Sequence, residues 1–569
     1  MTDLEEKPKK KNSRSERRNR SRRRKQEIRK QKLQALHDAV LHSIPDQYID
    51  LYPRARMMGR HFTVHIGPTN SGKTYDAVQA LMKAESGVYL GPLRLLAYEQ
   101  YENLNRKEVP CNLLTGEERY DTEGAKITAS TIEMCDFSRT YDVAVIDEGQ
   151  MVGDLERGGA WTAAILGLCA EEIHLCASEN AEEILLKLIE ECDDDYDVVY
   201  HERQTPLLVE DRSFRFPGSV QPGDALIVYS RRSVHAVAAE LQRHKIPCSM
   251  IYGALPYDVR HEQARRFAEG ETKVVVATDA IGMGLNMPIR RIVFLEMQKF
   301  DGFEKRDLRS DEIKQVAGRA GRYGIYEEGY VSSLGQRPFI RHGLKAKDKP
   351  VEKAVISFPE SLLDIDASLL DLLKRWAEIP VHEGYMRENP QRAIRLTEIA
   401  GEWSKDKYFL YQCITIPFDE KDNRLLSLWR EMVQLEAYGE TLPFDEYIPY
   451  VPKRRQTADD LEKLTQSYAR CDLLYSYADK FHHTEAIPDI MEAKRYLSTA
   501  IMHVLAKEKL RSRRCRMCGR EIPWNYPHAV CERCMSYRRW RRNWEKDLDN
   551  DYLPAEAYDT LEDPDEETR

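Results

Sequence analysis

The sequence has no long apolar run, and no stretch approaches the ~18 consecutive apolar residues of a membrane-spanning helix. We therefore expect no membrane partner. No apolar segment follows the start Met1-Thr-Asp-Leu-Glu-Glu6, so a secretory leader is not expected, and the early acids argue against a transit peptide. Eight of the twelve cysteines are scattered singly, as in proteins of a reducing compartment. These absences together predict a cytoplasmic protein.

Charge is unevenly distributed along the 569 residues, although the net charge is only −9. Residues 7–32 contain fifteen Lys or Arg against two Glu, and residues 507–544 contain twelve against three. Residues 545–569 contain eleven acidic and two basic residues. An acidic average with two concentrated basic segments favours a polyanionic partner.

Short apolar runs alternate with amphipathic stretches of helix length over residues 60–205 and again over 225–335. Such alternation predicts parallel sheets covered by helices on both faces. After residue 345 the pattern becomes mostly helical, with apolar stripes over 461–475 and 493–505. The expected strands cover 62–66, 87–90, 143–146, 225–229, 249–252, 273–277 and 291–295, and the expected helices between them include 75–83, 233–243 and 259–269.

These patterns predict an α/β protein with two tandem α/β domains, a C-terminal helical region and a small zinc-ribbon-like module. The expected parts are a basic, largely disordered tail (1–50), a first α/β domain (51–205), a second (206–345), a mainly helical domain (346–505), a four-cysteine module (506–544) and an acidic tail (545–569).

One nucleotide-binding motif lies between the first predicted strand and its helix, where the sequence matches G-x-x-x-x-G-K-[ST]. In this motif backbone N–H groups surround phosphate oxygens, the lysine faces the β- and γ-phosphates, and the last hydroxyl ligates Mg²⁺. The sequence therefore predicts an ATP and Mg²⁺ site. Its residues are Gly67, Pro68, Thr69, Asn70, Ser71, Gly72, Lys73 and Thr74.

Two further elements suit ATP hydrolysis. The strand ending at Ile146 is followed by Asp147, placed to hold Mg²⁺ together with Thr74, and by Glu148, placed to deprotonate the attacking water. In the second α/β half, Arg319 and Arg322 are three residues apart and would share one face, able to reach the γ-phosphate as arginine fingers. A solvated basic face is the alternative for these two arginines.

Together these motifs resemble those of superfamily-two helicases, and in particular the mitochondrial-degradosome (suppressor-of-Var) ATP-dependent RNA helicases and their bacterial relatives. Two departures from the family pattern are Gly149, where an apolar residue is more usual, and Cys176-Ala-Ser-Glu179 in place of Ser-Ala-Thr. The segments that carry the resemblance are 67–74, 91–97, 114–118, 144–150, 160–162, 166–172, 251–256, 277–286 and 315–322.

The resemblance implies two RecA-like domains with ATP between them and single-stranded RNA running across both, in RNA turnover or processing and with 3′ to 5′ polarity. A ribonuclease is a further partner that the resemblance suggests. The implied hydrolysis set is Lys73, Asp147, Glu148, Gln315, Arg319 and Arg322. The implied RNA-backbone contacts are Pro92, Arg94, Thr131, Ser230 and Thr278, with Asp279 linking them to the nucleotide and Phe300–Arg309 as a strand-separating hairpin.

Four clustered cysteines predict a structural zinc site. Cys515, Cys518, Cys531 and Cys534 have the spacing C-x₂-C-x₁₂-C-x₂-C, in which two knuckles close on one tetrahedral Zn²⁺. Gly519 would permit the tight turn, and His528 is an alternative ligand. Trp524, Tyr526, Tyr537, Trp540 and Trp544 are interleaved with seven arginines, at 511, 513, 514, 538, 539, 541 and 542. This mixture favours stacking on unpaired RNA bases, with a protein-docking ribbon as the alternative.

Two other functions compete with an RNA helicase. A DNA helicase or translocase is possible on these residues because backbone contacts tolerate either sugar. An RNA-binding scaffold switched by ATP is the second alternative, but the presence of Glu148 and of both arginines argues against it.

Overall fold

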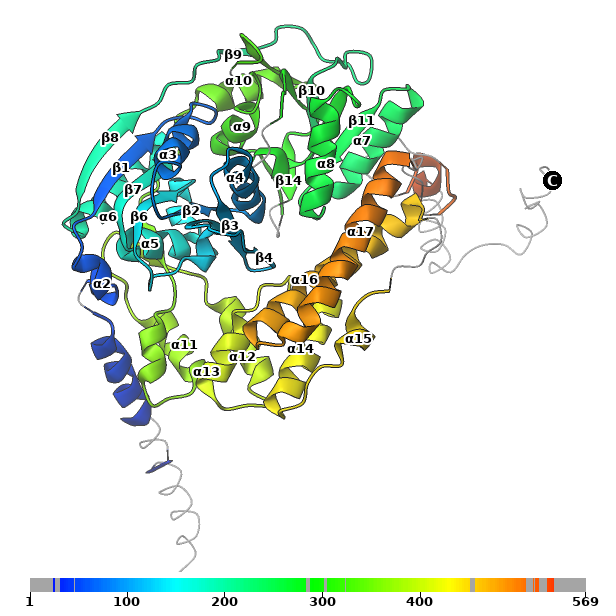
Figure 1. The fold of residues 1–569 in the computed structure, drawn as a ribbon. Coiled ribbons are helices and arrows are strands. Elements are labelled where there is room, and N and C mark those ends of the chain that lie inside the picture. Colours follow the sequence, from blue (N-terminus) through cyan, green and yellow to red (C-terminus); the bar gives the residue numbers. More distant parts are fainter. Residues whose placement is uncertain are drawn as a thin grey trace, which may run out of the picture.

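The computed structural model describes residues 24–25, 31–45, 47–282, 287–300, 304–322, 324–450, 456–507, 515, 517–520 and 530–536. Two α/β domains lie next to each other, and a helical region follows them in the chain and packs against both (Figure 1). The two predicted α/β domains are therefore confirmed.

The first domain contains an eight-stranded sheet of order β4-β3-β5-β2-β6-β7-β1-β8, parallel except for the β3–β4 pair. Side chains of β6 alternate between two apolar clusters: Ala144 and Ile146 face one, Val143 and Val145 the other. The sheet is thus buried on both faces, as its continuous apolar strands predict. The strands are β1 (His61–Ile66), β2 (Gly87–Gly91), β3 (Cys111–Thr115), β4 (Glu118–Tyr120), β5 (Ile127–Thr131), β6 (Tyr141–Ile146), β7 (Ala170–Ala177) and β8 (Asp195–Tyr200). The helices are α2 (Pro53–Arg56), α3 (Lys73–Leu81), α4 (Arg94–Arg106), α5 (Gly158–Gly167) and α6 (Glu182–Glu191).

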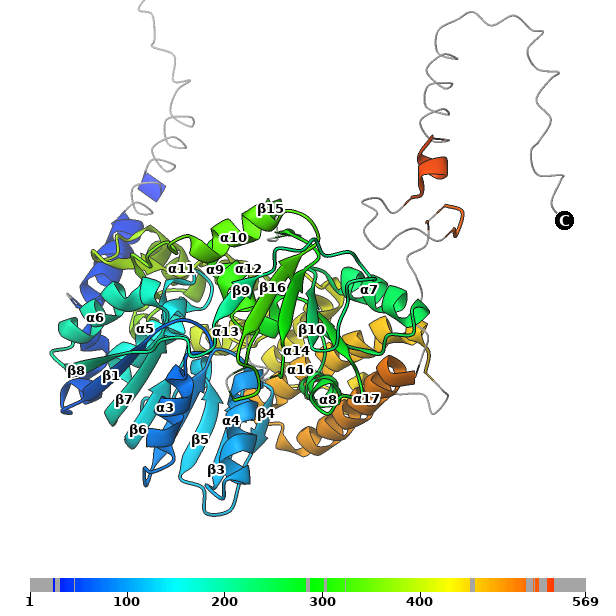
Figure 2. The ribbon, with the colours of Figure 1, turned by 90° about the horizontal axis from the view of Figure 1, so that it is seen from above.

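The second domain contains a six-stranded parallel sheet of order β11-β12-β10-β13-β16-β9, seen beside the first sheet in Figure 2. The chain crosses from one sheet to the other between Tyr200 and Leu207. The strands are β9 (Leu207–Val209), β10 (Asp224–Ile227), β11 (Cys248–Ile251), β12 (Val274–Ala277), β13 (Arg291–Phe294) and β16 (Gly329–Ser333). The helices are α7 (Arg231–Arg243), α8 (Tyr257–Ala268), α9 (Ser310–Ala317) and α10 (Arg337–Lys345), and a hairpin is formed by β14 (Gln298–Phe300) and β15 (Lys305–Asp307).

The described residues of the helical region form no apolar core of their own. Leu372 and Trp376 of α11 belong to the apolar cluster of the first domain, whereas Trp429 and Tyr477 belong to that of the second. The region predicted as one domain therefore extends the cores of both α/β domains. Its elements are β17 (Ala354–Ile356), α11 (Leu369–Glu378), β18 (Tyr385–Arg387), α12 (Gln391–Ala400), α13 (Lys407–Ile414), α14 (Asn423–Ala437), α15 (Phe444–Tyr447), α16 (Leu461–Lys480) and α17 (Ile487–Lys507).

Part of the segment predicted to be a disordered tail is ordered. Residues 31–43 are helical, Val40 is buried, and Tyr48 packs edge-on against Tyr385 with ring centroids 4.8 Å apart. The predicted acidic tail lies outside the described residues. Among the described helices, none combines the length and the apolar character that crossing a bilayer requires.

Candidate nucleotide site and central cavity

The loop that follows β1 has the backbone shape of a phosphate cradle. Asn70 and Gly72 adopt φ values of 62° and 94°, and α3 begins at Lys73. The Lys73 ammonium donates hydrogen bonds to the carbonyl oxygens of Gly67 and, at 2.8 Å, of Pro68. Burial lowers the pKa of Lys73, while the Glu148 and Asp147 carboxylates oppose this shift. The motif lysine thus lies inside the loop and near both acids.

Asp147 is held by three donors at the end of β6. Its carboxylate accepts hydrogen bonds from the Thr74 hydroxyl at 3.1 Å, the Tyr89 hydroxyl at 2.8 Å and the Glu148 N–H at 3.0 Å. The Trp161 indole N–H binds the Asp147 carbonyl at 2.9 Å. Burial, and then the Glu148 carboxylate, raise the pKa of Asp147 to about 6, and the donors oppose this. The two predicted Mg²⁺ ligands, Thr74 and Asp147, are therefore in contact.

Gln150, the third residue after Asp147, links Glu148 to the segment after β7. The Gln150 amide donates to the Glu148 carboxylate, and its carbonyl oxygen accepts the Ser178 N–H at 3.1 Å. The segment after β7, which departs from the family pattern, is thus connected to Glu148. A Cβ on Gly149 would lie 3.0 Å from the Leu175 side chain, so a larger residue here would require β7 to shift slightly.

Gln315 of α9 lines the space between the domains, and Arg319 and Arg322 lie in the turn that follows α9. Arg319 donates to the Gly282 carbonyl at 3.0 and 2.6 Å. Its charge also contributes to lowering the pKa of Lys73, so the two cations lie close together. The structure therefore brings the predicted finger Arg319 to the phosphate loop.

Sequence reasoning missed Glu99 of α4, which faces the arginine pair from the first domain. Burial raises the pKa of Glu99 to about 7, whereas the charges of Arg319 and Arg322 oppose this shift. Nothing in the sequence distinguishes this acid from the other polar residues of an amphipathic helix. The arginines thus face a carboxyl group across the cleft.

Arg203, in the crossover between the domains, was also missed. Its guanidinium donates to the Thr69 carbonyl at 3.2 Å and to the Gly318 carbonyl at 2.7 Å, and it also binds the Ala320 carbonyl. Asn70 reinforces this contact by donating to the Gly321 carbonyl at 3.2 Å. The phosphate loop is therefore joined directly to the turn that carries Arg319.

A cavity of about 2660 Å³ lies between the two α/β domains and the helical region. Pro92, Thr131 and Thr278 line it, as the resemblance implies for RNA contacts. They stand at or just after the carboxyl ends of β2, β5 and β12, the edge at which parallel sheets bind ligands.

Ser230 and Asp279 make other contacts than those predicted. The Ser230 hydroxyl accepts the Ser233 N–H at 3.0 Å and thereby caps α7, and Ser230 is not among the residues that line the cavity. Asp279 lines the cavity and forms an ion pair of 3.4 Å with Lys299 of the hairpin. Residues 283–286 and 301–303 of the predicted motifs lie outside the described residues.

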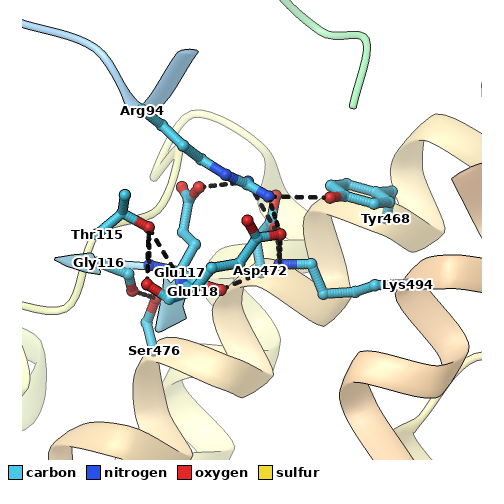
Figure 3. A network of polar contacts seen from close by, with 9 residues as sticks. All are labelled: Arg94, Thr115, Gly116, Glu117, Glu118, Tyr468, Asp472, Ser476 and Lys494. Carbon is cyan, nitrogen blue, oxygen red and sulfur yellow. Dashed lines mark hydrogen bonds and ion pairs between the residues drawn. The ribbon is translucent and has the colours of Figure 1, made fainter. Parts of the chain in front are cut away.

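Arg94 lines the cavity but is already ion-paired (Figure 3). Its guanidinium contacts Glu117 at 2.7 Å and Glu118, and it donates to the Tyr468 hydroxyl at 3.2 Å. Asp472 lies 3.7 Å away, and it binds Lys494 of α17 at 2.8 Å. A phosphodiester at Arg94 would have to compete with these carboxylates. Glu117 lies just before β4, Glu118 begins it, and Asp472 lies on α16.

The four clustered cysteines converge as predicted. Their sulfur atoms all lie within 4.8 Å of one another, and Cys518 Sγ is 3.7 Å from Cys531 Sγ. A tetrahedral Zn²⁺ with Zn–S bonds of about 2.3 Å requires S···S distances of about 3.8 Å. Gly519 has φ of 68°, which suits the predicted turn. His528 and the interleaved aromatic residues and arginines lie outside the described residues.

Comparisons with known proteins match both α/β domains. A model of the DEXQ-box helicase domain of Suv3 matches residues 49–201, and a model of the helicase conserved C-terminal domain matches 213–324. The rice (Oryza sativa subsp. japonica) ATP-dependent RNA helicase SUV3, mitochondrial, is 43% identical over 53% of this chain and 53% of its own length. The Caenorhabditis elegans SUV3 homolog is 32% identical over 82% of this chain and 68% of its own length. The human protein SUPV3L1 is 33% identical over 78% and 60%.

The chain spans only about half the length of the rice relative. It spans 37% of the length of the chicken (Gallus gallus) ATP-dependent RNA helicase SUPV3L1, mitochondrial. These relatives are all named as mitochondrial proteins, which contradicts the predicted cytoplasmic location. That prediction rested on early acidic residues and scattered thiols, and neither feature separates the cytoplasm from another reducing compartment.

Proposed function

The chain belongs to the Suv3 family of DEXQ-box helicases, and we propose on this premise that it is an ATP-dependent RNA helicase in RNA turnover or processing. One observation carries the proposal: the loop of Lys73, beside the Thr74–Asp147 pair, borders a cleft between two domains, and Asn70 and Arg203 join that loop to the turn that carries Arg319. Such a cleft can hydrolyse ATP only when both domains are in place, which allows hydrolysis to be coupled to domain movement.

Each group has a role that its position supports. The loop N–H groups and Lys73 bind the phosphates, and Thr74 and Asp147 would hold Mg²⁺, which neutralises charge on the β- and γ-phosphates. Glu148 accepts the proton of the attacking water, and Gln150 orients its carboxylate. Arg319 and Arg322, with Gln315 beside them, face the γ-phosphate from the second domain.

The RNA strand runs through the central cavity. Pro92, Thr131 and Thr278 are small or hydroxyl-bearing groups at strand ends, which suits contact with phosphates and sugars rather than base edges. Glu148, Gln150 and Ser178 all line the cavity, so the Gln150–Ser178 contact would couple hydrolysis to the bound strand. The β14–β15 hairpin, joined to the second domain by the Lys299–Glu312 ion pair of 2.6 Å, would separate the strands.

The four-cysteine module holds a structural Zn²⁺ and adds RNA affinity. Four thiolates close the tetrahedron and leave no open position, so this metal has no catalytic role. The arginines and aromatic residues around the cysteines suit stacking on unpaired bases and attraction of phosphates.

The proposal is tested by steady-state ATP hydrolysis with single-stranded RNA and with DNA of matched sequence. We expect RNA to stimulate hydrolysis at least several-fold more than DNA at equal concentration. Equal stimulation would favour a DNA or sugar-indifferent translocase. Hydrolysis that responds to neither polymer would reject the proposed function.

A further inference from the structure

Lys494 of α17 is a buried lysine at the junction of the helical region and the first domain (Figure 3). Its side chain is 3% exposed, and its ammonium lies 2.8 Å from the Asp472 carboxylate and 3.5 Å from the Glu118 carboxylate. It also donates a hydrogen bond to the Glu117 carbonyl at 3.2 Å. A buried ammonium is costly unless anions and acceptors surround it, and here both are supplied. Lys494 therefore compensates carboxylates of the first domain and of the helical region together.

The carboxylates that Lys494 compensates are also those that hold Arg94. Arg94 forms ion pairs with Glu118 and, at 2.7 Å, with Glu117, and Asp472 lies 3.7 Å from its guanidinium. Two cations thus share three carboxylates, and the cluster has one more negative charge than positive charges. Arg94 is among the residues that line the cavity, whereas Lys494 is not. One cation of the cluster is therefore accessible to a strand in the cavity, and the other lies behind it.

Arg94 keeps donor capacity for a further anion. Its Nε is enclosed and, among the described residues, has no hydrogen-bond partner. Glu117 has the most exposed side chain of the three carboxylates, so water can replace Arg94 there at the lowest cost. The more buried Glu118 and Asp472 require another cation once Arg94 turns to a phosphate, because removing one partner of a buried ion pair is strongly destabilising. Lys494 already contacts both.

The helical region fixes the position of the Lys494 ammonium. The Lys494 Nζ lies 5.3 Å from the ring centroid of Tyr468 and 5.5 Å from that of Tyr475, which are cation–π distances. The Ser476 hydroxyl donates to the Gly116 carbonyl at 2.8 Å and fastens α16 to the turn before β4. This cation is therefore held by contacts that do not involve the cavity.

We propose that Lys494 is a positioning residue that frees Arg94 to bind a phosphodiester of the RNA strand. The phosphate takes the place of the carboxylates at Arg94, and Lys494 compensates Asp472 and Glu118 when they are released. The inference rests on the proposed function, because it concerns the strand that the helicase holds. Lys494 does not contact that strand, so the helical region contributes to RNA affinity through the charge balance of the first domain.

The test changes the charge balance of the cluster in the full-length chain. Lys494→Met removes the cation and keeps most of its apolar stem, and Arg495→Met is the control, because Arg495 is the next residue of α17 and is exposed. Affinity for a uridine oligonucleotide is measured without nucleotide at several salt concentrations, and the melting temperature shows whether each variant is folded. For Lys494→Met we expect about tenfold weaker binding. Its log–log salt slope should be smaller by about 0.7, because Arg94 stays with its carboxylates and one phosphate contact is lost.

Asp472→Asn changes the balance in the opposite direction. It removes one competitor for Arg94 without changing the side-chain shape, so we expect about threefold tighter binding. Combining Asp472→Asn with Lys494→Met restores the charge of the wild-type cluster, so affinity should return to within about threefold of the wild type and the salt slope should recover. Arg495→Met should match the wild type, since an exposed charge is screened by salt.

Three results would overturn the role of Lys494. One is an unchanged salt slope in Lys494→Met, and another is a combined variant that binds as weakly as Lys494→Met, because a loss caused by packing alone is not rescued by charge. The third is unchanged or weaker binding in Asp472→Asn, which decides the matter even if Lys494→Met does not fold. A wild-type chain that does not bind the oligonucleotide rejects the proposed function and this role with it.

Discussion

The predicted nucleotide-binding residues and the predicted RNA contacts come from the same motifs, but they differ in the contacts that their side chains make in the structure. In the cleft, Lys73 donates to carbonyl oxygens of its own loop, and Thr74 donates to Asp147. Among the predicted RNA contacts, Arg94 lines the cavity but is ion-paired, and Ser230 caps α7 outside the cavity lining. Residues positioned by local backbone geometry can be assigned from a motif, whereas a long side chain depends on partners that the motif does not contain.

The strongest test of the cleft is Lys73→Ala. Removing the ammonium leaves the loop without its charge for the β- and γ-phosphates, so we expect ATP hydrolysis to fall at least about a hundredfold. Binding of RNA without nucleotide should change less than threefold, because Lys73 is not among the residues that line the cavity. Steady-state hydrolysis within threefold of the wild type would refute the assignment of this loop.

Glu148→Gln separates chemistry from binding inside the cleft. The amide keeps the shape and the contact with Gln150 but cannot accept a proton, so turnover should fall about a hundredfold or more. ATP should still bind and tighten the RNA complex, since the phosphate contacts remain. The measurement is RNA affinity with and without ATP, and an affinity indifferent to ATP would contradict coupling across the cleft.

Arg94→Ala tests whether Arg94 stabilises the protein through its ion pairs as well as contacting RNA. Removing one cation leaves the buried Glu118 and the half-buried Glu117 and Asp472 facing Lys494 alone, and such uncompensated charge costs about 3 kcal/mol. We expect a lower melting temperature as well as weaker RNA binding, whereas Lys73→Ala should leave the melting temperature nearly unchanged. Weaker RNA binding with no loss of stability would show that Arg94 is a simple RNA contact after all.

Acid should destabilise the first domain beneath its phosphate loop. His65 lies in a chain of imidazoles, 2.8 Å from His174 and 2.9 Å from His201. Burial, then these neighbours, lower the pKa of His65 to about 4, against about 6.5 in the unfolded chain. The neutral folded form is therefore favoured above pH 6.5, and stability is lost as pH falls from 6.5 towards 4.

The expected loss for His65 between pH 7 and pH 5 is about 2 kcal/mol. Thermal unfolding of the wild type and of His65→Gln at both pH values measures it. The variant should show a shallower pH dependence, whatever its stability at pH 7. Equal pH dependence in the two chains would show that folding does not shift the pKa of His65.

The smallest expected effect concerns the cysteine module, which lies apart from both the cleft and the cavity in sequence. Cys515→Ser removes one of four ligands, and metal binding supplies the folding free energy of so small a module. We expect loss of bound zinc and an RNA salt slope reduced by at least about 0.7. Zinc loss with an unchanged slope would favour a docking site for a protein partner.

The fold was largely predictable because buried parallel strands have a simple signature. The strands 62–66 and 143–146 lie within β1 and β6, and the glycine-rich loop between strand and helix is predictable from the spacing G-x-x-x-x-G-K-[ST] alone. The merging of α11 with the first domain was not predictable, since an amphipathic helix does not reveal which core its apolar face joins. Arg203 and Glu99 were missed for a related reason: each is a single charged residue whose partners lie on another domain.

Strand displacement tests the central claim most directly, namely that ATP hydrolysis in the cleft drives RNA through the cavity. Short RNA duplexes with a 3′ or a 5′ overhang are mixed with the protein, ATP and a trap strand. We predict ATP-dependent release of the strand from the 3′-overhang duplex by the wild type and none by Glu148→Gln. RNA-stimulated hydrolysis without release from either duplex would contradict the account.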